Sequence, residues 1–249
     1  MASQRKREII VAADLEALAK AAAERLLSRI AQSSGAIAIC LTGGSGPEPL
    51  YALLAGEPYR SRVPWQRVHW FMGDDRFVPL GHAYSNMGAA KRIFLDRVHA
   101  PPENIHAIPT GMTDPDEAAR AYENELKRFY GRNALDPAQP LFQLVLMGLG
   151  PDGHTASLFP HSAALDEANR WVVGIEQAQL QPFVPRVTLT FPALASTREM
   201  LFIVSGAEKR EILARVLAEE DLPAARTWSD GALVWLIDRA AAPGQRGGS

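Results

Sequence analysis

The chain is poor in features that several classes of protein require. It holds one cysteine, Cys40, among 249 residues, which excludes an internal disulfide and a cysteine-based zinc cluster. No apolar stretch approaches the roughly 18 uninterrupted residues of a membrane-spanning helix. The N-terminus is polar and leads straight into a strand-like run, so we expect no secretory signal and a reducing, cytoplasmic location.

A charge excess of one sign is also absent. Lys and Arg total 26 and Asp and Glu total 28, which leaves a formal net charge of -2. Nucleic acid is therefore not an expected partner, because binding it needs a basic face that neutralises phosphates. With 47% hydrophobic and 22% charged residues, the composition is that of an ordinary folded protein.

Strand-like and helix-like segments alternate along the chain. Short apolar runs predict strands at residues 8–11, 36–41, 68–72, 104–108, 142–147, 171–175, 187–189, 200–204 and 233–237. Spacing and capping residues predict helices after Asp14 and after Pro47, and over residues 85–98, 115–130 and 208–220. Without a repeat or a linker, this pattern predicts one α/β domain over residues 1–242, with a mostly parallel sheet and helices on both faces. Residues 243–249 are predicted to form a disordered tail.

Glycine and polar residues follow three of the predicted strands. These segments span residues 42–47, 73–76 and 148–155. In open α/β sheets, ligands bind beyond the carboxyl ends of the strands. If the three strands are neighbours, the three segments share one crevice.

The first segment contains Gly43, Gly44 and Ser45 and precedes a helix that opens at Pro47. Such a loop can turn backbone N–H groups toward an anion or sugar hydroxyls. It is not the phosphate loop of nucleotide hydrolases, because no Gly-Lys-Ser/Thr follows, and Pro47 stands where a serine nucleophile elbow needs its last glycine. The alternative is a plain tight turn.

The second segment contains Asp74, Asp75 and Arg76. Adjacent carboxylates on a strand point to opposite faces, so we expect one to orient a neighbour and the other to meet a ligand. Arg76 could hold an anionic substrate group through two parallel hydrogen bonds. A strand-terminal ion pair on the surface is the alternative.

The third segment matches Gly-x-Gly-x-x-Gly at residues 148–153, and Glu176 follows about 20 residues later, which is the outline of a dinucleotide-binding fingerprint. That motif needs a helix long enough to cross the sheet, but Pro160 interrupts it after about two turns. A nucleotide cofactor is therefore not expected.

His154 lies just beyond this glycine turn, where we expect a short helix to begin. A helix N-terminus disfavours a protonated imidazole, so His154 is predicted to be a neutral base near pH 7. Backbone N–H groups of the turn could stabilise an oxyanion. The alternative is a structural histidine. Ser157 is expected to cap or pack rather than act as a nucleophile, and the other histidines lack metal-ligand spacing, so no metal is expected.

Several segments together resemble the 6-phosphogluconolactonase family, from about Ile37 to Ala241. They are residues 41–45, 73–76 with Ser85 and Asn86, 148–160, 185–190, Gly206 with Lys209, and 235–238. The block from His154 to Pro160 is the most specific of them. The resemblance implies a Rossmann-like fold shared with sugar-phosphate isomerases and deaminases, without a nucleotide. It also implies hydrolysis of 6-phospho-D-glucono-1,5-lactone to 6-phospho-D-gluconate in the oxidative pentose phosphate pathway.

The resemblance also implies roles for individual residues. His154 matches the family's catalytic histidine, and Arg76, Arg186 and Lys209 match basic positions that could hold the phosphate. Asp75 departs from the family's usual Glu, and Gly46 from a common Thr. The candidate site therefore comprises His154 and Asp152 as catalytic residues and, as substrate contacts, Gly43, Gly44, Ser45, Asp75, Arg76, Gly150, Arg186 and Lys209.

Two other functions stay open at this point. Glucosamine-6-phosphate deaminases share the glycine loop and the strand-end acid, but after their Gly-His they carry an Asn-Glu-Pro type of sequence where this chain has Ser157 to Pro160. A non-catalytic sugar-phosphate sensor could use the same crevice. The expected partner is a phosphorylated sugar lactone, without cofactor, nucleic acid or membrane, and a monomer is favoured.

Overall fold

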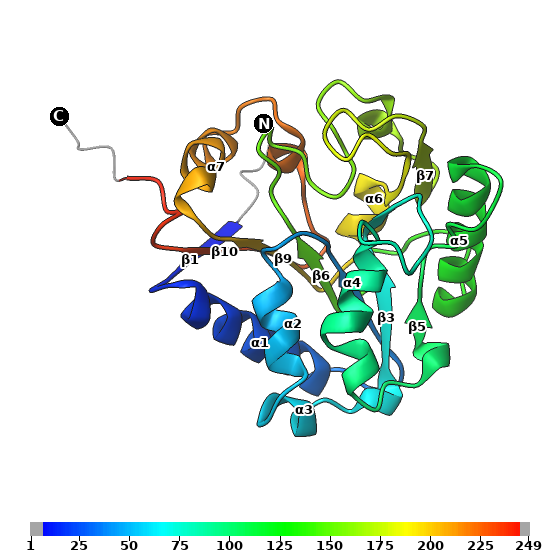
Figure 1. The fold of residues 1–249 in the computed structure, drawn as a ribbon, viewed down its shortest axis with the longest axis horizontal. Helices are drawn as coiled ribbons and strands as arrows, with labels where there is room; N and C mark the ends of the chain where they lie inside the picture. Colours follow the sequence, from blue (N-terminus) through cyan, green and yellow to red (C-terminus); the bar gives the residue numbers. More distant parts are fainter. Residues whose placement is uncertain (1–6, 245–249) are drawn as a thin grey trace.

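A seven-stranded parallel sheet forms the centre of the computed structural model, which describes residues 7–244. Its strands run, from one edge to the other, in the order β1 (Arg7–Ala12), β10 (Ala232–Asp238), β9 (Glu199–Val204), β6 (Leu144–Met147), β2 (Ile37–Leu41), β3 (Val68–Met72) and β5 (Ile105–His106). In Figure 1 the arrows of β6, β3 and β5 point toward the top of the view. Because β6, β2 and β3 are neighbours, the loops that follow them meet at one edge, as predicted.

The α-helices of the described range connect and cover these strands. They are α1 (Leu15–Ala31), α2 (Glu48–Leu54), α3 (Tyr59–Arg62), α4 (Asn86–Ile93), α5 (Pro115–Tyr130), α6 (Phe191–Ala195) and α7 (Arg210–Leu217). Short 3-10 turns lie at Trp65–Arg67, Leu95–Arg97, Pro102–Asn104, Ala163–Asp166, Ala207–Lys209 and Pro223–Arg226. None of the described helices combines the length and apolarity needed to cross a bilayer.

The central strands are apolar because both of their faces are covered. Every residue of β2, β6 and β9 is buried, as expected for inner strands of a parallel sheet. On one side α1, α2 and α4 pack against one another (Figure 1). The mostly parallel α/β architecture predicted from the sequence is therefore confirmed.

A second, smaller sheet was not predicted. It is antiparallel, with the order β4 (Asp74–Arg76), β8 (Arg186–Leu189) and β7 (Val172–Ile175), and α5 packs against β7 and β8. The sequence predicts strands over most of β7 and β8 but not their separate sheet, because apolar runs of four residues look alike in buried strands of either kind. The predicted helix over 85–98 is also too long, since α4 ends at Ile93 and a 3-10 turn follows. Of the predicted tail, residues 245–249 lie outside the described residues.

Helix ends follow the capping residues of the sequence. Asp14 accepts a hydrogen bond from the backbone N–H of Ala17 at the start of α1, and Asp114 accepts one from Glu117 at the start of α5. α5 ends at Gly131, whose positive φ of 73° suits a residue without a side chain. These caps satisfy backbone groups that a helix leaves unpaired at its ends.

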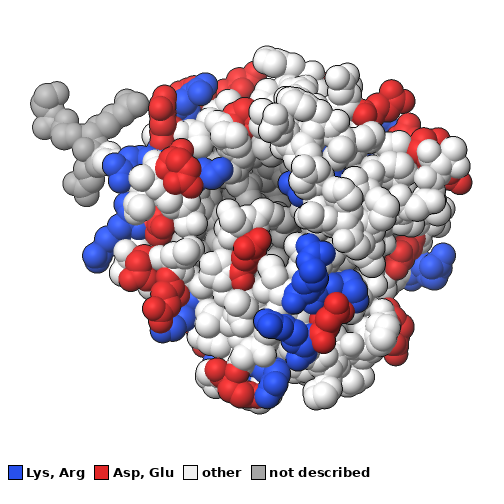
Figure 2. Space-filling view, in the orientation of Figure 1, with Lys and Arg blue, Asp and Glu red and all other residues white. Residues whose placement is uncertain are grey.

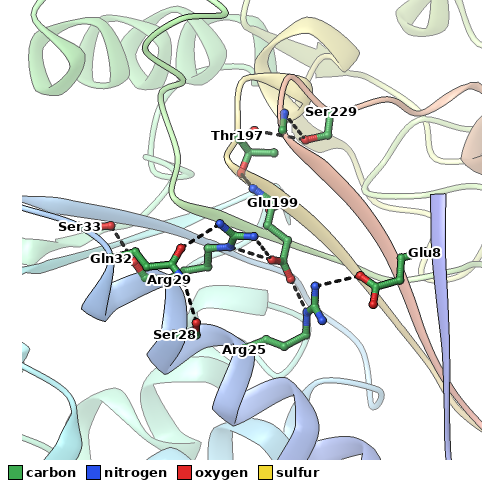
Figure 3. A network of polar contacts seen from close by, with 10 residues as sticks. Glu8, Arg25, Ser28, Arg29, Gln32, Ser33, Thr197, Glu199 and Ser229 are labelled. Carbon is green, nitrogen blue, oxygen red and sulfur yellow. Dashed lines mark hydrogen bonds and ion pairs between the residues drawn. The ribbon is translucent and has the colours of Figure 1, made fainter. Parts of the chain in front are cut away.

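A buried carboxylate fastens α1 to the sheet (Figure 3). Glu199, at the start of β9, is 2% exposed and accepts hydrogen bonds from Arg25 Nε at 2.6 Å and Arg29 Nε at 2.7 Å. Arg25 also reaches the exposed Glu8 at 3.4 Å. The two arginines are four residues apart and so lie on one helix face, which lets a single carboxylate bind both.

Replacing Glu199 with alanine should lower the free energy of unfolding by about 3 kcal/mol, because it leaves two guanidinium groups without their buried partner. The loss stays at the low end for a buried pair, since both arginine side chains are 25% exposed and water can reach them. Urea unfolding at pH 7 measures it. The matched control is Glu8→Ala, which removes an exposed partner and should cost less than about 1 kcal/mol; equal losses for the two variants would contradict the assignment.

Candidate active site

A cavity of about 460 Å³ opens beyond the carboxyl ends of β6, β2 and β3. Figure 2 shows the molecule hollowed at this place, with basic atoms visible at the edge of the hollow. The wall brings together all three segments predicted from the sequence, and adds part of the loop before β8 and the residues after β9. It includes Gly43, Gly44, Ser45, Asp74, Arg76, Gly150, His154, Ser157, Leu180, Gln181, Arg186, Glu208 and Lys209.

His154 is paired with a carboxylate in this wall. Its Nδ1 lies 2.5 Å from Oδ1 of Asp152, and its backbone N–H donates to the same oxygen. A carboxylate only accepts, so Nδ1 carries the proton and Nε2 is left as the basic nitrogen. Burial raises the pKa of Asp152, but the hydrogen bond and charge of His154 outweigh it and hold that pKa below its usual value. The pair is therefore arranged as a base and its orienting carboxylate.

The expected helix at His154 is absent. Residues 154–158 instead form a tight turn closed by a bridge between Thr155 and Leu158, and Thr155 Oγ1 donates to the Gly148 carbonyl at 2.8 Å. The prediction that a helix N-terminus controls the imidazole is wrong, because Pro160 and this turn leave no room for a helix. Asp152 supplies the control instead, by fixing which ring nitrogen carries the proton.

Gly150 gives His154 its space. A Cβ atom at Gly150 would lie 2.0 Å from Nδ1 of the His154 ring, so any side chain there displaces the imidazole. The backbone N–H of Gly150 also donates to the His154 carbonyl at 2.8 Å. Gly150, which matches one glycine of the dinucleotide-binding fingerprint, is thus required because the His154 ring packs closely against it.

Two arginines face each other across the second sheet. Arg76 of β4 and Arg186 of β8 are cross-strand partners, and Arg186 is 4% exposed. Loop carbonyls hold one nitrogen of each: Arg76 donates to Tyr84 at 2.8 Å and Arg186 to Pro182 at 2.9 Å. Within residues 7–244, neither buried Nε atom has a partner. Unpaired guanidinium donors beside a cavity are typical of a phosphate or carboxylate site.

Burial, and then the positive charge of Arg76, lower the pKa of Arg186 below its usual value, although the negative charges of Asp74 and Asp75 act in the opposite direction. A guanidinium nevertheless keeps its proton at neutral pH. The two cations therefore repel each other in a poorly solvated place, and an anion bound between them relieves that repulsion.

The glycine loop and Lys209 lie in the same wall. Lys209 donates from Nζ to the Leu149 carbonyl at 2.7 Å, beside the glycine turn that precedes His154. A Cβ at Gly43 would meet Oδ1 of Asn86 at 2.0 Å, and Gly44 has a φ of 86°. Both glycines are thus required, one by a close approach and one by its backbone conformation.

Asp75 does not border the cavity. It is 2% exposed and accepts hydrogen bonds from the Ser85 hydroxyl and from the backbone N–H groups of Asn86 and Met87, at the start of α4. The prediction that Asp75 contacts the ligand does not fit this arrangement, because its carboxylate is turned toward α4. As expected for adjacent strand residues, Asp74 points the other way and borders the cavity.

A larger cavity, of about 650 Å³, lies elsewhere in the molecule, beside α6, β10 and residues 224–228. Charged side chains around it are paired with each other, as Arg226 is with Asp166 and Arg7 with Glu219. Over residues 7–244, no group of three or more His, Cys, Asp or Glu side chains is placed to hold a metal ion. The cavity at the strand ends is therefore the candidate active site.

A parallel sheet with a histidine–carboxylate pair and arginines with unpaired Nε atoms at its strand ends is typical of an α/β enzyme for a small anionic substrate. The chain belongs to the family described as glucosamine-6-phosphate isomerases/6-phosphogluconolactonase, whose model matches residues 13–235. The resemblance seen in the sequence is thereby confirmed.

Individual relatives agree with this family. A 6-phosphogluconolactonase of Synechocystis sp. is 42% identical over 208 residues, which cover 82% of each chain. The solved structure of 6-phosphogluconolactonase from Trypanosoma brucei has a TM-score of 0.83 at 29% identity and covers 96% of this chain and 98% of its own. A monomeric glucosamine-6-phosphate deaminase, 18% identical with a TM-score of 0.78 and coverage of 94% and 98%, shares the fold alone.

Gly150→Ala should break the contact between His154 and Asp152, because the new methyl group occupies the position of the ring. We expect the downfield signal of the hydrogen-bonded ring N–H, followed by ¹H–¹⁵N NMR, to disappear while the protein stays folded. Gly148→Ala is the matched control, since a Cβ there finds its nearest atoms at 3.9 and 4.0 Å, an ordinary contact. Survival of the signal in Gly150→Ala would show that the ring does not need this space.

Proposed function

We propose that this protein hydrolyses 6-phospho-D-glucono-1,5-lactone to 6-phospho-D-gluconate, a step of the oxidative pentose phosphate pathway. One observation carries the proposal: a single cavity is lined by His154, whose ring is paired with Asp152 behind it, and by the cations Arg76 and Arg186. The histidine–carboxylate pair suits ester hydrolysis, and the two arginines suit the binding of a phosphate group. The named relatives support the same substrate.

In the proposed reaction, Nε2 of His154 takes a proton from a water molecule as the water oxygen attacks the lactone carbonyl carbon. The carbonyl oxygen becomes an oxyanion in the tetrahedral intermediate. When the bond from this carbon to the ring oxygen breaks, His154 returns the proton to that oxygen. Asp152 holds the ring and stabilises the imidazolium between the two transfers. General base catalysis of this kind supplies roughly 10²–10⁴-fold.

We assign the oxyanion to the glycine loop. Among the described residues, the backbone N–H groups of Gly43 and Gly44 have no hydrogen-bond partner, and both residues line the cavity. Free amides at fixed positions stabilise the developing charge without reorganising. Lys209 is the alternative donor on the same wall.

We assign the substrate phosphate to Arg76 and Arg186. The free Nε of each can donate to a phosphate oxygen, and a dianion between them offsets their mutual repulsion. Phosphate binding in this position fixes the rest of the substrate relative to His154, and such positioning contributes to rate as well as to affinity.

Two further functions remain distinguishable by experiment. A glucosamine-6-phosphate deaminase would release ammonia from its substrate, and a non-catalytic sensor would be stabilised thermally by the ligand without turnover. The Ser157 to Pro160 segment favours the lactonase over the deaminase, as argued from the sequence. We also propose a single domain over residues 1–242, a monomer and a cytoplasmic location, as expected from the sequence.

His154→Ala should reduce lactonase activity by at least about a hundredfold, because the general base is lost. The measurement is acceleration over spontaneous hydrolysis of the phosphorylated lactone, near neutral pH and at short times. An unchanged melting temperature shows that the fold survives. A folded His154→Ala protein with full activity would refute the assigned role.

Arg76→Ala should raise KM for the phosphorylated lactone by about 10- to 100-fold with a smaller effect on kcat, because it removes a charged hydrogen bond made equally before and during the reaction. Activity on unphosphorylated glucono-1,5-lactone should stay the same. Arg60→Ala is the control, since Arg60 is an exposed residue paired with Glu57. A loss of equal size with both lactones would contradict phosphate binding by Arg76.

A further inference from the structure

The proposed reaction leaves one buried carboxylate of the cavity wall without a role. Asp74 is 6% exposed and lines the cavity. Its only hydrogen-bond donor among the described residues is the hydroxyl of Ser157, at 2.6 Å, and it makes no ion pair there. A buried carboxylate is costly unless it is paired or fully hydrogen-bonded. Asp74 therefore lies beside the cavity with unused acceptor capacity.

The chemistry of Asp74 limits what can complete its hydrogen bonds. An ionised carboxylate has about four acceptor positions and no donor, so a ligand group must donate to it. An anionic group is excluded by like-charge repulsion. Neither Arg76 nor Arg186 makes a hydrogen bond or ion pair with Asp74 among the described residues, and both are assigned to the phosphate. A neutral hydroxyl group of the ligand is the remaining partner.

The position of Asp74 agrees with a contact to the sugar part of the substrate. Asp74 and Arg76 are two residues apart on β4, so their side chains leave the same face of the strand, about 6.6 Å apart along it. That separation is on the order of the length of a sugar ring. A ligand whose phosphate is held at Arg76 can thus place a ring hydroxyl at Asp74.

Ser157 fixes the direction in which Asp74 faces. It is 1% exposed and lies within the turn that follows His154. Its backbone N–H lies 3.3 Å from Oγ1 of Thr188, the residue paired with Asp74 across β4 and β8. The Ser157 hydroxyl donates a hydrogen bond to Oδ2 of Asp74, and it has no other acceptor among the described residues. Ser157 is therefore a positioning residue for Asp74 and joins it to the loop of the base.

We infer that Asp74 determines specificity for a polyhydroxylated ring: its carboxylate accepts a hydrogen bond from a ring hydroxyl of the bound lactone, with Ser157 as its positioning residue. This inference rests on the proposed function. A phosphorylated lactone that lacks this hydroxyl leaves the buried carboxylate unpaired and is rejected for that reason.

The experiment compares kcat/KM for the phosphorylated lactone with kcat/KM for its 2-, 3- and 4-deoxy analogues. For the unaltered protein we expect one analogue to react about 10- to 100-fold less efficiently, the range of a hydrogen bond to a charged group. In Asp74→Ala that penalty should fall to within about twofold, because the charged acceptor is gone. In Ser157→Ala it should be intermediate, since the carboxylate remains but loses its orientation.

Asp75→Asn is the matched control, because it alters the adjacent buried carboxyl that faces α4, and its deoxy penalty should equal that of the unaltered protein. Asp74→Asn keeps the shape of the side chain and serves if Asp74→Ala does not fold; its penalty should also fall. Melting temperatures report folding for every variant.

The outcomes separate the two proposals. No acceleration of the fully hydroxylated lactone by the unaltered protein defeats the proposed function itself. Full activity, with a deoxy penalty that survives both Asp74 variants, overturns the inference alone. The inference is also overturned if Asp74→Asn lowers KM by the same factor for every phosphorylated lactone. That result would mean that the Asp74 carboxylate only balances the charge of the two arginines and does not contact a ring hydroxyl.

Discussion

The site depends on the point at which the chain leaves the parallel sheet. Gly73 donates its N–H to the end of β2 and accepts a hydrogen bond from the end of β8, and β4 begins at the next residue. This junction fixes the register of β4 against β8, and with it the pairing of Arg76 with Arg186. The same register turns Asp74 toward the cavity and Asp75 toward α4. A shift by one residue would exchange the two carboxylates and turn Arg76 away.

Much of the fold could be predicted from the sequence because its inner strands are continuous apolar runs and its helices begin at recognisable caps. The runs that became β2, β3 and β6 were assigned correctly, and their adjacency placed three polar segments at one edge. The second sheet could not be predicted, since the pairing of β4 with β8 joins residues about 110 positions apart. For the same reason the contact of His69 with His106 across β3 and β5, at 2.9 Å, leaves no trace in the sequence.

The sequence predicts most of the residues that line the candidate site but not the contacts between them. His154 and the glycines around it were identified from their place after a strand, and the structure brings them to the cavity wall. The reason given for a neutral imidazole was wrong, because Asp152 rather than a helix terminus acts on the ring. Alternation along a strand predicts that Asp74 and Asp75 point to opposite faces, but it does not predict which of the two faces borders the cavity. That choice required the register of β4.

The carbonyl groups of Tyr84 and Pro182 accept hydrogen bonds from Arg76 and Arg186 and hold these two side chains in place. Long guanidinium side chains ordinarily lose rotational entropy when they grip an anion. Here much of that freedom is already lost during folding, so the proposed phosphate site is preorganised and the binding of an anion would need little rearrangement. If Arg76 and Arg186 bind the phosphate as proposed, sequence changes in these two loops would alter affinity without touching the ligand.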